Sequence, residues 1–537
     1  MKRKLGWFGL GFAGAELAAA NLPPLVCVPA AAFLALLAFW KRRRDVKIPL
    51  LGALCGLAWF ALFTLIFVQP CRALAGQTVT CTAVVETDAE ASYSDSRLRG
   101  TLRLTEINGK PARLRVQCPS FPGESAGERF EASFALSSLP DNRYRLSRNS
   151  RGVYLQAEYL GSYRGLAASA APRFVLFRLR QRWSAVLRRW LPKQLDGMEA
   201  AMLLADKSHL EDAVQQAFRT AGVSHLLAVS GLHLALLCGL LGFGRRWRFY
   251  KPLILLRGAA ALFYLLLTGA PVSVLRAGLV LAVALAGEFL LQPVDLLTST
   301  GFAAALMGLQ NAYAPCDIGF QLSFCAVLGV QAAAALTEAE RRAAAQGKSA
   351  ALRLVWRLAE PVQVAALASL ATLPVLVAHG MSTSLVGIVC NVLVVWMLQP
   401  ALQMGILLLI FSAVPFLLPL VNLTGLVLSL WLKAMLGIVE RCAALPFASV
   451  YLPQRYTLFV LAVLGALAVC YWHGKAVRLY RLLRALHSAG RGHGYLDAAG
   501  CGGDKSCRRV QQSLRGLCAE RAGSGAFPRR RKQPERR

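Results

Sequence analysis

The sequence predicts a polytopic α-helical membrane protein that carries a small all-β domain. Of its 537 residues, 56% are hydrophobic and 16% are charged, whereas an average soluble chain has about 25% charged residues. The hydrophobic residues lie in long runs, and one polar stretch with alternating hydrophobic positions interrupts them. This composition excludes disordered, fibrous and collagen-like proteins, and the long runs favour many membrane spans.

Thirteen hydrophobic runs are candidates for membrane spans, three before the polar stretch and ten after it. Several are shorter than the roughly 20 residues that a span needs. We therefore expect 11 to 13 hydrophobic segments, with one or two runs re-entrant or lying at the membrane surface. The runs cover residues 5–20, 22–40, 48–68, 225–243, 253–269, 271–291, 298–312, 317–335, 361–380, 383–399, 401–420, 422–439 and 457–473.

Basic residues in the short loops predict the orientation of the chain, which has a net charge of +32. Dense clusters occur at Lys41–Arg44 and Arg245–Arg248, and a longer cluster runs from Arg341 to Arg357. The positive-inside rule places these loops in the cytoplasm, so the third run leads outward and the polar stretch lies outside. If all thirteen runs cross, however, the basic tail also emerges outside, against the same rule. The side of the C-terminus therefore stays open.

Residues 71–165 predict a small β domain outside the membrane. Leu102–Leu104 and Ala112–Val116 alternate between apolar and basic side chains, as strands with one buried face do. Asn108 and Gly109 fall between them and are a strong hairpin signal.

The 14 cysteines do not predict a metal site, because no CxxC pair with zinc-ribbon spacing occurs. We expect neither a metal nor a cofactor. Two cysteines, Cys81 and Cys118, lie in the outward domain, where an oxidising environment permits a disulfide between them. Two unpaired thiols are the alternative.

Residues 166–220 predict amphipathic and linker helices. The stretch 173–195 has seven Lys and Arg and no acid, and Arg178, Arg182 and Arg189 share roughly one helical side. Two interpretations remain open: an anchor on anionic lipid headgroups, or a basic surface that contacts DNA. Under the second interpretation the contacting residues are Arg178, Arg182, Arg188 and Arg189.

A short motif before the fourth run places charged residues between two helices. Asp206 and Lys207 stand at the end of one predicted helix, and Arg219 lies on the next. A lone motif of this kind indicates little by itself.

The densest group of polar residues in an apolar run comprises His225, Ser230, Gly231 and His233. Ionisable groups within membrane spans are costly, so each is a candidate functional residue. Three interpretations compete: hydrogen bonds between helices with Gly231 allowing close approach, a serine hydrolase with Ser230 as nucleophile, and a polar lining of a transport path.

Two further groups lie in later runs. Arg276 follows Pro271 by about one turn, and a buried arginine needs a carboxylate, a phosphate or a water-filled cavity. Snorkelling of its long side chain to the interface is the alternative. Asp317, Gln321 and Ser323 begin another run, and Asp317 is a candidate partner of Arg276, with helix capping as its alternative role.

Taken in order, these segments resemble the ComEC/Rec2 family of competence proteins. The resemblance covers roughly residues 5–473 and departs from the family pattern at Ala205, where a glycine usually precedes the acidic residue. The residues that carry it are Ala201–Leu210, Phe218–His233, Thr268–Gly278 and Asp317–Val330, with a weaker match at Ala371–Asn391.

The resemblance implies transport of single-stranded DNA across the cytoplasmic (inner) membrane during natural transformation. The implied channel-lining residues are those of the three polar groups above. The implied partners are single-stranded DNA, membrane lipid, the DNA-receptor and motor proteins of the competence machinery, and further copies of the chain. The implied parts are N-terminal transmembrane helices at 1–70, an OB-like domain at 71–165, linker helices at 166–220, a multi-span channel domain at 221–473 and a basic tail at 474–537.

Two absent motifs shape the remaining expectations. No HxHxDH motif occurs, so we expect a channel without the family's metallo-β-lactamase-like nuclease domain. No GxxxxGK[ST] loop occurs, so a partner must power translocation.

The tail at 474–537 holds 16 Lys and Arg against four acids, and we expect it to be disordered; its composition is also typical of out-of-frame coding. The rival functions are transport of a small anion or lipid, and intramembrane serine hydrolysis.

Overall fold

The computed structural model describes residues 3–23, 26–27, 29, 44–86, 90–91, 98–122, 125–142, 144–169, 171–240, 251–344, 350–457 and 461–462. The chain divides into two compact units, Met1–Leu461 and Ala462–Arg537, and the elements below belong to the first. The predicted tail, most of the second and last hydrophobic runs, and the basic cluster Arg245–Arg248 lie outside the described residues.

The first helices pack through glycines. They are α1 (Lys4–Asn21) and α3 (Arg44–Phe63), and α3 continues through a π-helical turn η1 (Thr64–Val68) into α4 (Gln69–Arg72). A Cβ added to Gly52 or Gly56 of α3 would collide with the backbone of α1. Small residues allow helices in membranes to approach this closely.

The β domain is a closed barrel. Its main sheet has the order β1-β5-β6-β4-β3-β2, and β1 also pairs with β3, which closes the barrel. Only β4 and β6 run parallel. The elements are β1 (Thr78–Val85), β2 (Glu90–Ala91), β3 (Leu98–Ile107), β4 (Lys110–Phe121), β5 (Arg129–Ser138), α5 (Arg145–Ser150) and β6 (Val153–Leu166).

The predicted hairpin is confirmed. Asn108 and Gly109 connect β3 to β4 with φ values of +49° and +76°, as the type I′ turn of a two-residue hairpin requires. Alternate side chains of the strands fill the core, where Phe121, Phe130 and Phe134 are fully buried.

Cys81 and Cys118 form no disulfide in the structure; both are free thiols. β1 and β4 are not neighbours in the sheet, so these residues are not cross-strand partners. Both side chains are buried, and burial raises the pKa of each thiol to about 12. The structure thus corresponds to the alternative of two unpaired thiols.

The rest of the unit is helical, with one small two-stranded sheet, β7–β8. The elements are α6 (Pro172–Trp190), α7 (Leu195–Leu204), α8 (Asp212–Thr220), η2 (Ser224–Leu226), α9 (Gly231–Leu240), α10 (Lys251–Leu267), α11 (Val272–Leu290), α12 (Leu296–Gln310), η3 (Ala314–Cys316), α13 (Ile318–Ala344), α14 (Ala350–Ala378), β7 (Ser382–Ser384), α15 (Gly387–Ser412), η4 (Pro415–Leu417), α16 (Leu418–Ala443), β8 (Ser449–Tyr451) and η5 (Gln454–Tyr456).

Six helical segments in the described part of the chain are long and apolar enough to cross a membrane, so the chain is a polytopic helical membrane protein with a small β domain. They are Lys47–Arg72, Val272–Leu290, Ile318–Thr337, Ala359–Ala378, Gly387–Ser412 and Pro415–Ala443.

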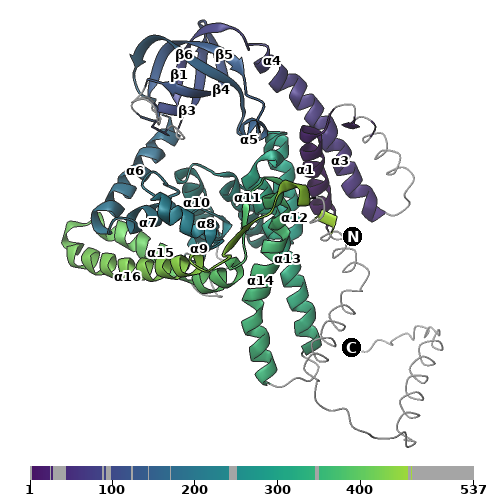
Figure 1. Cartoon of the computed structure of the whole chain (residues 1–537), viewed down its shortest axis with the longest axis vertical. Coiled ribbons are helices and arrows are strands. Elements are labelled where there is room, and N and C mark those ends of the chain that lie inside the picture. The colour runs from purple at the N-terminus through teal and green to yellow at the C-terminus, as the bar shows by residue number, and fades with distance from the viewer. Residues whose placement is uncertain are drawn as a thin grey trace, which may run out of the picture. The chain divides into compact units, whose positions relative to one another are not determined.

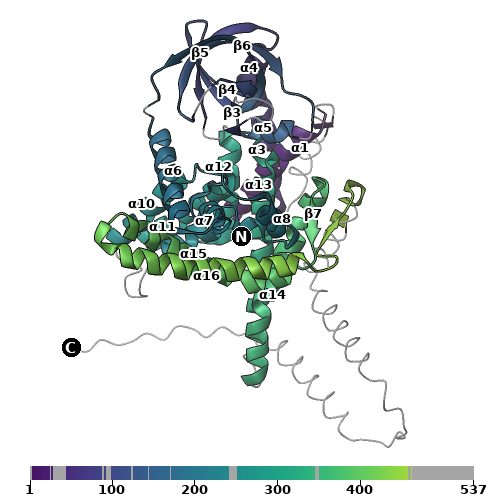
Figure 2. The same ribbon diagram turned by 60° about the vertical axis from the view of Figure 1, so that its left-hand side comes forward.

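The boundary predicted between the runs 383–399 and 401–420 is wrong. One helix, α15, continues through Pro400 and ends at Ser412. Proline removes one hydrogen bond from a helix, but neighbouring helices allow membrane helices to tolerate it. α15 packs beside α16, and both views show this pair running across the direction of α14 (Figures 1 and 2). The largest core cluster lies where α7 meets this pair.

The barrel and the helices contact each other at two places. α6 follows β6 directly and leads from the barrel to α7 and α10 (Figure 2). At the other place, the amide of Asn311, which ends α12, donates to the backbone carbonyls of Asn149 and Ser150 at 3.0 and 2.8 Å. These bonds fix the end of α5 against the helical region.

Candidate functional site

Ser230 and His233 are hydrogen-bonded to each other across the first turn of α9. The hydroxyl of Ser230 accepts a hydrogen bond from the N–H of Leu232 at 3.3 Å, which caps the helix. The N–H of Ser230 donates to Nδ1 of His233 at 3.1 Å. This is a capping box in which histidine takes the place usually held by Glu or Gln. Helix capping therefore explains the three-residue spacing of the two side chains.

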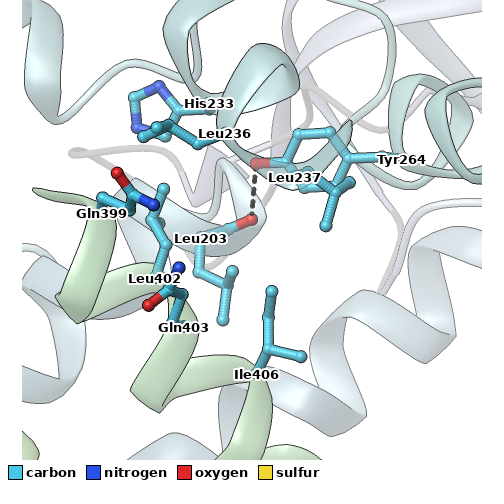
Figure 3. A pocket seen from close by; sticks show the side chains of 9 residues that line it. All are labelled: Leu203, His233, Leu236, Leu237, Tyr264, Gln399, Leu402, Gln403 and Ile406. Atoms are coloured by element: carbon cyan, nitrogen blue, oxygen red, sulfur yellow. Dashed lines mark hydrogen bonds between the residues drawn. The ribbon is translucent and has the colours of Figure 1, made fainter. Parts of the chain in front are cut away.

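The capping arrangement leaves one nitrogen of His233 unused. Because Nδ1 accepts a backbone N–H, the neutral ring carries its proton on Nε2. The residue is only 1% exposed, and among the described residues Nε2 has no hydrogen-bond partner. His233 lines a small pocket of about 20 Å³ that Tyr264, Gln399 and Gln403 also line (Figure 3). An unpaired donor thus stands beside a pocket between α9, α10 and α15.

The same geometry disfavours Ser230 as a nucleophile. A catalytic histidine accepts the serine proton on a nitrogen that is otherwise available. Here the Ser230 hydroxyl lies 3.0 Å from Nδ1, but that nitrogen already accepts a backbone N–H. The hydroxyl is itself engaged by the N–H of Leu232. These contacts are those of a helix cap.

The loop between α10 and α11 brings the start of α11 into contact with the residues just before α9. Pro271 lies directly before α11, so the proline separates the two helices as predicted. Gly269 and Ala270 turn the chain with φ values of +78° and +51°. The hydroxyl of Ser273 then donates to the carbonyl of Val229 at 3.0 Å. This bond holds the start of α11 beside the residue that precedes Ser230.

Arg276 is a buried cation between three helices. It is 8% exposed, and its Nε donates to the hydroxyl of Ser323 on α13 at 2.8 Å. Its guanidinium lies 5.6 Å from the ring centre of Phe324. A Cβ on Gly231 would lie 3.4 Å from Nη2, so glycine leaves room for the guanidinium at the start of α9. No carboxylate of the described residues forms an ion pair with Arg276.

The expected pairing of Arg276 with Asp317 is therefore wrong. Oδ1 of Asp317 accepts the N–H of Phe320 at 3.1 Å, so the carboxylate caps α13. The capping alternative is the one the structure adopts. Asp317 is 6% exposed, and the free N–H groups at the start of α13 stabilise its buried carboxylate.

Gln321 connects α13 to α14. Its side-chain N–H donates to the carbonyl of Pro315 at 3.0 Å, and its Oε1 lies 3.0 Å from Nε2 of His379, which must donate. The sequence patterns did not single out His379 as a site residue. The available signal was an ionisable residue near the end of the apolar run 361–380.

Most of the predicted channel-lining residues lie in two sets of contacts, which we call the polar network: one set joins the starts of α9 and α11 to α13, and the other joins the start of α13 to His379 after α14. Contacts join Ser230 to His233, the backbone at Gly231 to Arg276, and Arg276 to Ser323. Asp317 and Gln321 lie six and two residues before Ser323, at the cap and in the first turn of α13. His225 lies in η2, is exposed, and takes no part in these contacts.

Asp206 forms a second polar site at the end of α7. It accepts hydrogen bonds from the hydroxyls of Ser184 on α6 and Ser208 at 2.6 and 2.7 Å. Burial raises the pKa of Asp206, but these bonds and the charge of Arg180 outweigh it and hold the pKa below its usual value. Arg180 also donates to the carbonyl of Thr268 at 3.5 Å. Arg180, which the sequence analysis did not select, therefore links α6 to the loop before α11.

The apolar side of α6 packs within the protein. Leu187 is buried, and Leu179, Trp183 and Trp190 pack on the largest core cluster. This packing disfavours a helix whose apolar side lies in lipid. The basic side of α6 is exposed throughout, at Arg178, Arg182, Arg188 and Arg189, and the motif residues Lys207 and Arg219 are exposed as well.

Comparisons with known proteins identify the family of the chain. A family model described as competence protein matches residues 202–476, which include the whole polar network. The chain is 31% identical over 252 residues to ComE operon protein 3 of Bacillus subtilis (strain 168). That match covers 45% of this chain but 30% of the relative, so the chain spans less than a third of the relative's length. No solved structure matches the chain.

Proposed function

The chain belongs to the family of competence proteins, and from this premise we propose that it passes single-stranded DNA across the cytoplasmic membrane during natural transformation. It acts as a channel and not as an enzyme. The strand binds the barrel and α6 before it reaches the apolar helices. Separate DNA-receptor and motor proteins of the competence machinery deliver and pull the strand.

The observation that carries this proposal is the buried, uncompensated charge of Arg276. A DNA strand bears a negative charge on every nucleotide and cannot enter hydrocarbon without polar and basic groups. Arg276 offers a guanidinium at 8% exposure, and its described hydrogen bond goes to a neutral hydroxyl. Ser323 of α13 and the first residue of α9 lie beside it. A phosphate fits this environment because a buried cation needs an anion.

The surface of α6 supports the same proposal. Its exposed arginines follow one helical side, while its apolar side is already packed on protein. A basic stripe that is open to solvent attracts a polyanion without base specificity. Arg180, on the inner side of the same helix, reaches the loop before α11, so α6 connects the barrel with the helices that hold Arg276.

A deletion in a naturally transformable host tests the proposal. Labelled DNA that is protected outside the cytoplasmic membrane is measured separately from DNA that reaches the cytoplasm. We expect the deletion to retain the first and to lose the second. Equal amounts of DNA in the cytoplasm of deleted and parent cells would contradict the proposed function.

Complementation with Arg276→Met tests the charge itself. We expect a more than about tenfold loss of cytoplasmic DNA, as for the loss of a buried charge contact, and partial recovery with Arg276→Lys. Lys433→Met, which removes an exposed cation from the apolar helix α16, is the matched control and should transport normally. Transport of a small anion, the rival function, predicts instead that the deletion alters anion uptake in cells that are not competent.

A further inference from the structure

Three arginines gather on one carboxylate where the barrel meets α6. Oε1 of Glu86, directly after β1, accepts hydrogen bonds from Arg103 of β3 at 2.7 Å and from Arg173 of α6 at 3.3 Å. Nε of Arg115 on β4 lies 3.6 Å from the same oxygen. We call these four residues the arginine hub. It joins two strands of the barrel to the first turn of α6.

The arginine hub holds more positive charge than Glu86 can balance. Arg103 and Arg115 are direct cross-strand partners, and like charges in such a pair destabilise a sheet. Burial lowers the pKa of Arg173, and the repulsion of the other two arginines lowers it further against the attraction of Glu86. Nε of Arg173 is buried and has no hydrogen-bond partner among the described residues. Fixing α6 to the barrel would need a single arginine.

The arginines remain accessible, whereas the carboxylate does not. The side chains of Arg103, Arg115 and Arg173 are 32%, 43% and 34% exposed, and that of Glu86 is 10% exposed. An anion arriving from solvent therefore meets the guanidinium groups first. Guanidinium groups bind phosphate through paired hydrogen bonds, in the same way as they bind carboxylate.

A polar groove adjoins the arginine hub on the same face of the barrel. Thr101 and Gln117 are cross-strand partners two residues along from Arg103 and Arg115, so they point to the same side of the sheet. They line a groove of about 240 Å³. Nη1 of Arg115 donates to the carbonyl of Arg151 at 3.1 Å, which ties the arginine hub to the far wall. The other lining residues are Tyr144, Ser147, Arg148, Arg151 and Val153.

We propose that Arg103, Arg115 and Arg173 bind a phosphate of single-stranded DNA. In the absence of DNA, the carboxylate of Glu86 occupies the position of that phosphate. The groove binds the neighbouring nucleotide. This inference rests on the proposed function and assigns its first binding site. The basic side chains of the groove attract the backbone, and Tyr144, an exposed aromatic residue of the groove, offers a stacking surface for an unpaired base. A duplex keeps its bases stacked inside and lacks this second contact.

The test is oligonucleotide binding by the full chain in nanodiscs of neutral lipid, measured by fluorescence anisotropy with a labelled oligothymidylate. Glu86→Gln keeps an oxygen acceptor for the arginines but removes the competing charge, so binding should tighten about threefold or more. Arg173→Gln should weaken binding about threefold to tenfold and reduce the slope of log affinity against log salt by about 0.7. Arg164→Gln changes an exposed arginine on β6 outside the arginine hub and is the matched control.

Each outcome of these binding measurements either supports or contradicts the proposed phosphate site. Unchanged or weaker binding by Glu86→Gln, wild-type binding by Arg173→Gln, or no binding by the wild type overturns the site. Equal affinity for a duplex, or complete displacement by inorganic phosphate at constant ionic strength, shows a general anion site and also overturns it. If the variants behave as expected but deleted cells still deliver DNA to the cytoplasm, the proposed function fails while the binding site stands.

Discussion

The N–H of Ser230 donates to Nδ1 of His233 at 3.1 Å, so the serine holds one ring nitrogen and leaves the other without a partner. The pair therefore combines a structural role, capping α9, with a donor beside the pocket in Figure 3. The two roles belong to different atoms, and mutations can separate them.

His233→Gln should keep the cap and lose the ring. Glutamine is a normal partner in a capping box, so the thermal stability in detergent should stay close to that of the wild type. Transformation should fall at least about tenfold, because the donor at the position of Nε2 is displaced. His233→Ala should lose both the cap and transport. Normal transformation by a stable His233→Gln protein would remove the ring from the site.

Ala205→Gly should stabilise the protein. Ala205 ends α7 with φ +58°, in the left-handed region that costs a residue with a Cβ about 1 kcal/mol or more. The sequence departs from the family pattern at this position, and the structure shows which strain follows. Ala201→Gly, within the same helix, is the control and should destabilise by about 1 kcal/mol. Unfolding midpoints in detergent that shift in the same direction for both variants would contradict the argument.

Gly231→Ala should impair transport more than stability alone explains. Its Cβ would lie 3.0 Å from Cβ of Ala277 and 3.4 Å from Nη2 of Arg276, so α11, which carries both residues, must shift by a few tenths of an ångström. Gly239→Ala, two turns along α9, meets nothing within 4 Å and should be neutral or stabilising by up to about 1 kcal/mol. Transformation frequencies at matched protein levels give the comparison, and equal frequencies would show that the close approach has no function.

Asp206→Asn should lower stability in a pH-dependent way. The folded protein holds the pKa of Asp206 below its usual value, so its stabilisation is present above the unfolded pKa of about 3.9 and is lost as the pH falls through the lower folded value. We expect a loss of roughly 1–3 kcal/mol at neutral pH, from hydrogen bonds to a charged group, that shrinks in acid. Asp212→Asn on α8 is an exposed control. A difference that is constant with pH would show that the charge of Asp206 is unimportant.

Cys81 and Cys118 should resist maleimide in the folded protein. Both are buried, and burial raises the pKa of each thiol to about 12, so little reactive thiolate forms at neutral pH. After denaturation without reductant both should label, as judged by peptide mass spectrometry. Labelling of the denatured protein only after reduction would show that the barrel forms the disulfide.

Local signals in the sequence predicted local structure well. The hairpin at Asn108 and Gly109 needs two residues with positive φ, and these are the residue types that adopt it. Pro271 separates α10 from α11 for an equally local reason. Pro400 shows the limit of such reasoning, because packing against neighbouring helices lets α15 continue through it.

Partners at long range could not be predicted from composition or spacing. Arg276 pairs with Ser323 and not with Asp317, although both lie in the segment that the sequence indicated. Arg180 differs from Arg178 and Arg182 only in the side of the helix it occupies, and tertiary packing decides which side is inside. His379 joins the network through Gln321, and no spacing along the chain relates these two residues.

The unbroken helix through Pro400 also changes the count of crossings. Two predicted spans become one, so thirteen candidate runs become twelve. An even number returns the chain to the side on which it began. If the other runs all cross, the basic segment after residue 473 therefore reaches the cytoplasm, where the positive-inside rule expects so many lysines and arginines. On that condition, one continuous helix through Pro400 removes the conflict between the basic segment and the positive-inside rule.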